Sequence, residues 1–276
     1  MDIPVKRSFV AVNKAKLYYE IAGNGIPFVM IHAGVADHRQ WTNEFATFIK
    51  DYRVIRYDMR GFGKSEPVEG EFSHMGDLES LLDSLAIREP LVIMGCSMGG
   101  GIAMDFTVTH PDKVKALIIV DSGPSGLKLD VQQPEKFADA GKAFNEGNLD
   151  LACEIETQIW FDGTGRTPDQ VNQQMRSLLY EMNHIALENE VKNLGNRKPN
   201  LDTPTSERLH ELGCPVLVIV GEHDTPYCLA AAEYMTKEIK LAHKEVIRDA
   251  AHLPNMDHPE KFQKIVRDFL GNLHLD

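Results

Sequence analysis

The stretch Leu91–Gly101, LVIMGCSMGGG, decides the predicted fold of this chain. An apolar run predicts a strand up to Met94, Gly95-Cys96-Ser97-Met98-Gly99 follows, and residues 98 to about 109 predict a helix. A G-x-S-x-G motif between a strand and a helix places its serine on a tight turn that only small neighbours tolerate. Ser97 is therefore predicted to present its hydroxyl above the sheet edge, with the Met98 N–H directed at any anion formed beside it.

This motif alone does not distinguish an activated serine from a glycine-rich turn between a strand and a helix. A serine hydroxyl becomes a good nucleophile when a base removes its proton, and the base needs a carboxylate that fixes its tautomer. The rest of the chain must therefore supply an acid, a base and a second oxyanion donor.

Length and composition fit one large α/β domain with an insertion. The chain has 276 residues, 43% of them hydrophobic and 25% charged, which is ordinary for a globular protein. A net charge of −12 argues against a nucleic-acid partner, which would require a basic patch. The N-terminal MDIPVKRSFVAV lacks the apolar core of a signal peptide, and no run has the length of a transmembrane helix. We expect a cytoplasmic protein without a membrane partner; these features do not predict its oligomeric state.

The sequence carries no metal or cofactor signature. No H-x-x-x-H or H-E-x-x-H occurs, and the glycine-rich run 95–101 lacks the G-x-G-x-x-G spacing of a dinucleotide site. The four cysteines have no metal-ligand spacing: Cys96, Cys153, Cys214 and Cys228. We therefore expect a site without metal or cofactor.

Strand and helix patterns alternate from residue 27 to 123 and resume at 215, after an antiparallel hairpin predicted over 8–22. Because helices separate successive strands, the sheet is predicted to be largely parallel. Between these parts, helices are predicted at 134–146, 149–160 and 168–188. We interpret residues 124–205, called the cap segment below, as a helical insertion over a core formed by 1–123 and 206–276. Buried strands are predicted at 27–32, 52–57, 91–94, 115–120 and 215–220, and a further strand at 245–248.

Polar residues follow the predicted strands where each one ends. In open α/β sheets, catalytic groups gather at the carboxyl ends of the strands. A serine, a later aspartate and a still later histidine occur among these residues, in the Ser…Asp…His order of one hydrolase class. The polar residues at the strand ends are His32, Asp58, Ser97, Asp121, Asp224 and, one short loop onward, His252.

Five ordered stretches resemble the α/β-hydrolase superfamily, in the group of small esterases, enol-lactonases and cofactor-free haloperoxidases. They are IHAGVADHRQW (31–41), YDMRGFGKSEP (57–67), MGCSMGGG (94–101), GEHDTP (221–226) and AHLPNMDHPE (251–260). They span the chain outside the cap segment. The resemblance implies an α/β-hydrolase fold, with a mostly parallel eight-stranded sheet flanked by helices and a helical cap insertion.

The resemblance also implies roles for particular residues. Ser97 would be the nucleophile, Asp224 the orienting acid and His252 the general base, with the N–H groups of Met98 and Gly34 as oxyanion donors. This chain has His32-Ala33-Gly34 where family members usually carry His-Gly-x, so Val35 is the alternative to Gly34. The rivals to the acid and the base are Asp121 and His258, respectively.

The same resemblance favours some reactions over others. Haloalkane dehalogenases and epoxide hydrolases of the superfamily use an aspartate at the position of Ser97. Carbon–carbon bond hydrolases usually show Gly-Pro-Gly after the first histidine, which is missing here, so that reaction ranks low. The run 97–101, SMGGG, is common in haloperoxidase-like members. A perhydrolase is therefore one alternative, and a small-molecule receptor with little turnover is another.

We predict a serine hydrolase that cleaves a small or medium carboxylic ester or lactone through an acyl-enzyme. The cap residues Trp160, Phe161 and Met182, with Val35 and Leu253 from the core, are candidates for an apolar substrate pocket. The cap residues also fit the stripe that docks the cap helices onto the sheet, and we favour that interpretation for them.

Overall fold

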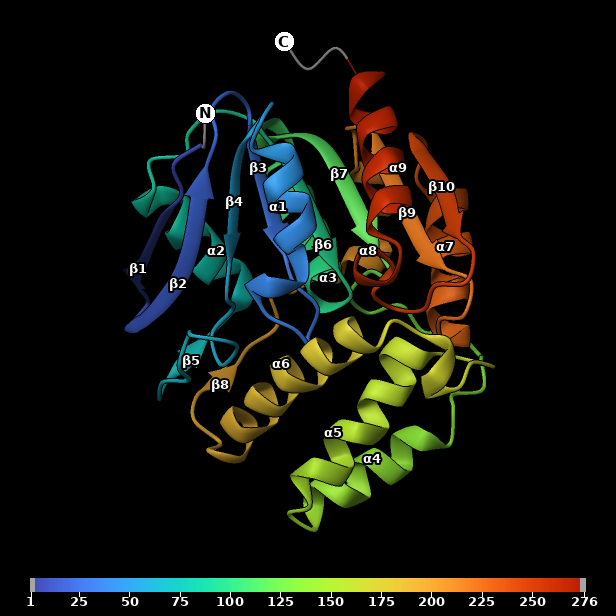
Figure 1. The fold of residues 1–276 in the computed structure, drawn as a ribbon. Coiled ribbons are helices and arrows are strands. Elements are labelled where there is room, and N and C mark those ends of the chain that lie inside the picture. The colour runs from blue at the N-terminus through green and yellow to red at the C-terminus, as the bar shows by residue number, and fades with distance from the viewer. Residues whose placement is uncertain (1–2, 274–276) are drawn as a thin grey trace.

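An eight-stranded sheet forms the centre of the molecule in the computed structural model, which describes residues 3–273 (Figure 1). The strand order is β1-β2-β4-β3-β6-β7-β9-β10. β2 is antiparallel to both β1 and β4, and the other neighbours are parallel. The strands are β1 (Lys6–Val12), β2 (Ala15–Ala22), β3 (Pro27–Ile31), β4 (Arg53–Tyr57), β6 (Leu91–Cys96), β7 (Val114–Val120), β9 (Val216–Gly221) and β10 (Ala242–Ile247).

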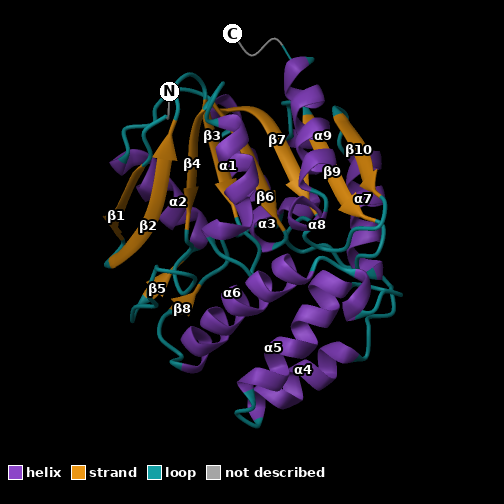
Figure 2. Cartoon of the chain, in the orientation of Figure 1, coloured by secondary structure: helices purple, strands orange, loops and turns teal. Residues whose placement is uncertain are grey.

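Helices cover both faces of this sheet, which explains why its central strands are continuously apolar (Figure 2). Every residue of β3, β6 and β9 is buried. One face packs against α2 (His74–Ser84), α3 (Met98–Thr109) and α7 (Pro226–Glu238). The other packs against α1 (Thr42–Phe48), α8 (Pro254–Asp257) and α9 (Pro259–Gly271). The α/β-hydrolase fold expected from the sequence is confirmed.

The cap segment contains α4 (Lys136–Asn145), α5 (Leu149–Thr157) and α6 (Gln173–Val191), which lie beyond one end of the central strands in Figure 1. A π-helical turn, Gln158–Asp162, follows α5. The third predicted helix begins five residues later than expected, at Gln173 instead of Pro168. The reason is that Pro168–Gln170 forms a separate 3-10 turn, and the Asn172 side chain caps α6 by accepting the N–H groups of residues 174 and 175.

A small second sheet joins the end of the cap segment to the core. β5 (Glu71–Phe72) pairs in parallel with β8 (Asn196–Arg197), and the two strands lie between the main sheet and α6 in Figure 1. The sequence analysis did not predict this pairing.

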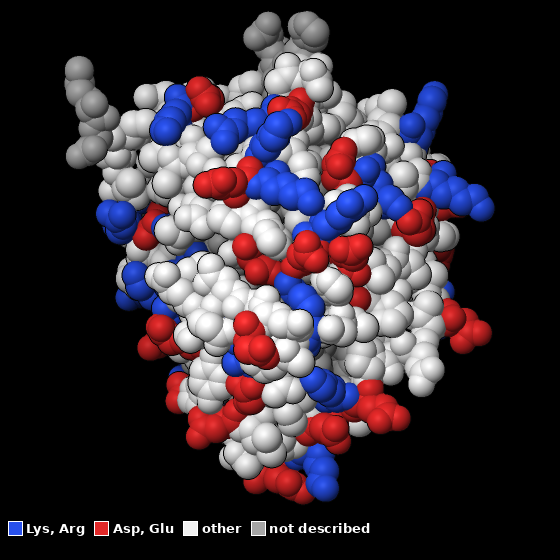
Figure 3. Space-filling model, turned by 45° about the vertical axis from the view of Figure 1, so that its right-hand side comes forward, with Lys and Arg blue, Asp and Glu red and all other residues white. Residues whose placement is uncertain are grey.

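The surface carries charges of both signs. Basic side chains are interspersed with acidic ones on the face drawn in Figure 3. No helix within residues 3–273 combines the length and the apolar character needed to cross a bilayer.

Candidate active site

Ser97 lies at the junction of β6 and α3 in a backbone conformation that L-residues rarely adopt, with φ 53° and ψ −117°. The residues two positions before and after it must be glycine because the helix packs directly on the strand. A Cβ atom on Gly95 would lie 2.1 Å from the Gly99 carbonyl oxygen, and one on Gly99 would lie 2.4 Å from the Ile31 carbonyl oxygen. Backbone hydrogen bonds hold Ser97 in this strained conformation, including the one from its N–H to the Val120 carbonyl at 2.9 Å.

His252 and Asp224 form a buried pair, with His252 Nδ1 2.8 Å from Asp224 Oδ2. Burial alone would raise the pKa of Asp224, but the charge and hydrogen bond of His252 outweigh burial and lower it. An ionised Asp224 accepts a hydrogen bond from Nδ1–H, which leaves Nε2 as the basic nitrogen of the ring. Trp160 orients the same histidine: its carbonyl accepts the His252 N–H at 3.2 Å and its ring lies 4.3 Å from the imidazole.

Asp121, the rival acid, makes other contacts. Its Oδ1 accepts the Gly221 N–H at 2.8 Å, and no donor reaches its buried Oδ2 within the described residues. Burial and the nearby Asp224 carboxylate raise the pKa of Asp121 well above its ordinary value. The pKa of Asp121 is raised and that of Asp224 is lowered, so the pair favours a protonated Asp121 beside an ionised Asp224. His258, the rival base, contacts the Asp249 carbonyl instead, at 3.1 Å.

The loop after β3 contains the candidates for the second oxyanion donor. His32 is buried, and its Nδ1–H donates to the Ala33 carbonyl at 2.7 Å while its Nε2 accepts the Met59 N–H at 2.9 Å. Burial lowers the pKa of His32, so the neutral ring fixes this loop. Gly34 lies against Met98, as a Cβ placed on Gly34 would be 3.4 Å from the Met98 methyl group. Within residues 3–273, neither the Gly34 N–H nor the Val35 N–H donates a hydrogen bond, so both stay candidates.

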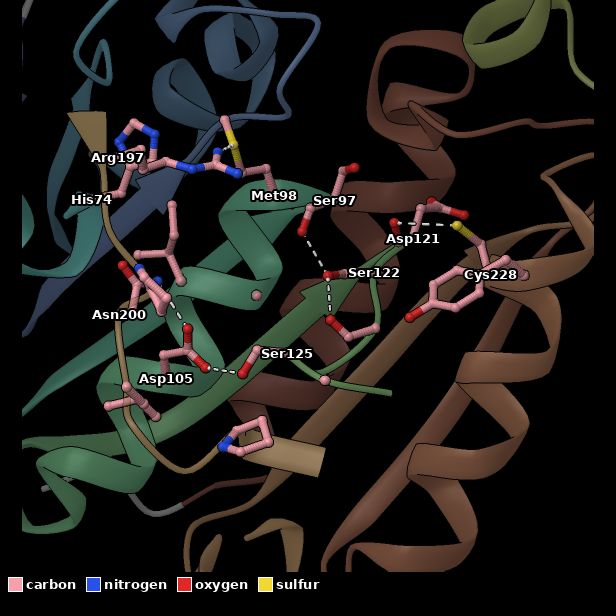
Figure 4. Close-up of a pocket in the computed structure, with 18 of the residues that line it drawn as sticks. His74, Ser97, Met98, Asp105, Asp121, Ser122, Ser125, Arg197, Asn200 and Cys228 are labelled. Atoms are coloured by element: carbon pink, nitrogen blue, oxygen red, sulfur yellow. Dashed lines mark hydrogen bonds between the residues drawn. The ribbon is translucent and has the colours of Figure 1, made fainter. Parts of the chain in front are cut away.

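Two cavities meet at Ser97. The first has a volume of about 760 Å³ and is drawn in Figure 4; the second has about 560 Å³. Five residues line both, namely His74, Ser97, Trp160, Arg197 and His252. The candidate nucleophile and the candidate base therefore face the same space.

The two cavities include only part of the predicted apolar pocket. Trp160 lines both cavities and Val35 lines the second. Phe161, Met182 and Leu253 line neither of these two cavities, because each is at most 1% exposed and packs in the apolar core that continues into α6. For Phe161 and Met182 this agrees with the alternative interpretation as docking residues.

Several residues beside the site escaped the sequence analysis. Cys228 Sγ lies 3.7 Å from His252 Nδ1, and Arg197 and His74 line both cavities.

Asp224, Cys228 and His252 have potential metal-ligand atoms within 4.8 Å of one another. They do not fit a metal ion well, because burial raises the pKa of the Cys228 thiol far above its ordinary value and His252 Nδ1 already bonds to Asp224.

Comparison with known proteins shows the family. A family model described as alpha/beta hydrolase fold matches residues 26–259. The chain is 30% identical over 270 residues to a 2-hydroxy-6-oxononadienedioate/2-hydroxy-6-oxononatrienedioate hydrolase of Paraburkholderia xenovorans, covering 94% of this chain and 92% of that relative. It is 28% identical over 239 residues to 3-oxoadipate enol-lactonase 1 of Acinetobacter baylyi, covering 86% and 85%.

Solved structures share the fold. A bromoperoxidase from Bacillus anthracis superposes with a TM-score of 0.80 at 22% identity, over 97% of this chain and 100% of the other. At this identity the likeness concerns the fold alone.

Proposed function

This chain belongs to the alpha/beta hydrolase fold family, and we propose that it hydrolyses a small or medium carboxylic ester or lactone through an acyl-enzyme on Ser97. The observation that carries the proposal is the arrangement at the cavity junction. Ser97 lies on a strained turn and faces the same two cavities as His252, whose Nδ1 bonds to a buried carboxylate. The enol-lactonase among the relatives supports the same class of reaction.

The reaction would proceed in two steps. His252 Nε2 removes the proton of Ser97 as its hydroxyl oxygen attacks the substrate carbonyl, and Asp224 stabilises the imidazolium that forms. The oxyanion is held by the Met98 N–H and by the N–H of Gly34 or Val35. His252 then gives its proton to the leaving alcohol, and water repeats the sequence to release the acid. One oxyanion donor contributes roughly 3–4 kcal/mol of transition-state stabilisation, and general base catalysis about 10²–10⁴-fold in rate.

A second candidate reaction follows from the relatives' names. The substrate named for the Paraburkholderia relative is a hydroxy-oxo dioate without an ester group, so its hydrolysis must divide a carbon–carbon bond. The same serine, histidine and oxyanion donors would serve that reaction. Its weakness here is the loop after β3, where the sequence HAGVAD stands instead of a Gly-Pro-Gly motif.

The proposal is tested with a chromogenic ester series of rising acyl length, together with lactones and a 2-hydroxy-6-oxo dioate. We expect ester or lactone turnover that peaks at one length and disappears in Ser97→Ala. Ser122→Ala is the matched control, since its hydroxyl donates to backbone carbonyls, that of Ser97 at 2.6 Å and that of Gly123 at 3.4 Å, and most turnover should remain. If the dioate is hydrolysed faster than the esters and lactones, and this hydrolysis depends on Ser97, the second candidate reaction is favoured.

If Ser97→Ala matches the wild-type protein across the whole series, the proposal is refuted. Peracid formation from peroxide and ligand-induced stabilisation would then test the perhydrolase and receptor alternatives.

A further inference from the structure

Arg197 is held at the junction of the two cavities by the small sheet. In the pairing of β5 with β8 it lies opposite Phe72, the Lys198 N–H donates to the Phe72 carbonyl at 2.8 Å, and the Asn196 N–H donates to the Gly70 carbonyl at 2.8 Å. The side chain extends toward Met98, whose Sδ lies 3.1 Å from Nη1 (Figure 4). Met98 directly follows Ser97, and Arg197 and Ser97 both line the two cavities, so the guanidinium and the candidate nucleophile border the same space.

The charge of Arg197 is not neutralised by a protein carboxylate within the described residues. A thioether is a weak acceptor and leaves most of the guanidinium's donors unused. The other arginine and lysine side chains that line the two cavities are paired. Arg60 bonds twice to Asp77, at 2.9 and 2.8 Å, and Lys198 contacts Glu71 at 2.8 Å.

The same holds for Arg176 on α6. Its guanidinium lies 2.6 Å from Glu154 and 2.9 Å from Asp162. Arg197 thus differs from its neighbours in having donors and a charge left for a ligand.

The groups around Arg197 leave it as the positive centre of the junction. Burial lowers the pKa of His74 to about 3, so its imidazole is neutral. Burial and the nearby Asp224 raise the pKa of Asp121, which disfavours a negative charge there. The oxygens of Asp105 are occupied by hydrogen bonds from Ser125, Thr205 and Asn200, at 2.9, 2.6 and 2.8 Å. The remaining acids each line one cavity only: Asp202 the first, and Glu156 and Glu190 the second.

We propose that Arg197 binds a carboxylate of the substrate, so that the esters or lactones cleaved at Ser97 carry a free acid group a short distance from the scissile carbonyl. The inference rests on the proposed function and names its substrate class. A guanidinium suits this role because its planar donors match a carboxylate in two parallel hydrogen bonds. Its position next to Met98 would orient the carbonyl toward the oxyanion donors.

The test compares half-esters with neutral partners of the same length. Substrates are the monoethyl esters of succinic, glutaric and adipic acids, each paired with the ethyl ester whose far end is a carboxamide, and released acid is measured by chromatography. We expect the wild-type protein to prefer at least one half-ester over its amide partner by about tenfold or more in kcat/KM, as a hydrogen-bonded charge provides. This preference ratio should fall to near one in Arg197→Met and be intermediate in Arg197→Lys.

Lys198→Met is the matched control, because it removes the neighbouring positive charge that Glu71 already pairs, and it should keep the preference ratio. Direct binding gives a second measurement: Ser97→Ala should bind an intact half-ester, and Ser97→Ala combined with Arg197→Met should bind it at least about tenfold more weakly.

The two proposals fail in different ways. Ser97-dependent turnover of the amide esters without preference for the half-esters, or a preference that survives Arg197→Met, overturns the role of Arg197 alone. Absence of Ser97-dependent turnover for both series overturns the proposed function and this inference with it.

Discussion

The two aspartates near His252 should respond very differently to the same substitution. Asp224→Asn replaces the carboxylate that accepts the His252 Nδ1–H at 2.8 Å with an amide that can donate in its place. The His252 ring then loses the hydrogen bond that fixes the tautomer with a basic Nε2. It also loses the nearby negative charge that stabilises the imidazolium. Because both groups are buried, solvent does not compensate, and we expect kcat to fall about 10⁴-fold.

Asp121→Asn should lower kcat by less than about tenfold. The raised pKa of Asp121 favours its neutral form in the folded protein, and an asparagine reproduces a neutral side chain of the same shape. Its amide oxygen can accept the Gly221 N–H and its NH₂ can donate toward Asp224, as the protonated acid does.

The assay is steady-state ester hydrolysis by both variants at neutral pH, with thermal unfolding to verify that each is folded. A loss in Asp121→Asn as large as in Asp224→Asn would refute the assignment of protonation states. A loss below about tenfold in Asp224→Asn would refute its role as the acid that orients His252.

Three further predictions concern stability and its pH dependence. Gly95→Ala should lower the free energy of unfolding, measured by urea unfolding, by about 3 kcal/mol or more. The reason is that the new Cβ would lie 2.1 Å from the Gly99 carbonyl oxygen. Gly101→Ala, whose Cβ would meet nothing closer than 3.9 Å, should instead stabilise α3 by about 0.5–1 kcal/mol; destabilisation would contradict the packing described. Burial raises the pKa of Glu44 from 4.5 to about 7, so the folded state retains a proton that the unfolded chain loses, and stability falls as pH rises through this range. Glu44→Gln should remove up to about 3 kcal/mol of that fall; an unchanged pH dependence of urea unfolding would show that Glu44 does not carry it.

Local sequence was enough to predict the elements that hold the candidate site. The strand before Ser97 and the helix after it are both present, because glycines and a short apolar run constrain a few consecutive residues. That Asp224 and His252 lie at the same edge of the sheet follows from where parallel strands end, whereas their pairing was implied by the resemblance. Their hydrogen bond is consistent with the resemblance from which the roles came.

What escaped prediction depends on contacts between distant residues. β5 and β8 have two residues each and are separated by more than a hundred residues, so no periodicity marks them, and Arg197 could not be placed at the cavities. From sequence, the apolar residues Phe161 and Met182 fit both a pocket lining and a core, and the core is the favoured interpretation. Only the packing of α6 on the sheet shows that they are core.

The central claim is that Ser97 carries the acyl group, and trapping that intermediate tests it most directly. The protein would be mixed with an activated ester, quenched within one turnover, and analysed by intact mass and peptide mapping. The account predicts one acyl group on Ser97 that disappears as product forms, and no adduct in Ser97→Ala. An adduct on another residue, or product formation that continues in Ser97→Ala, would contradict it.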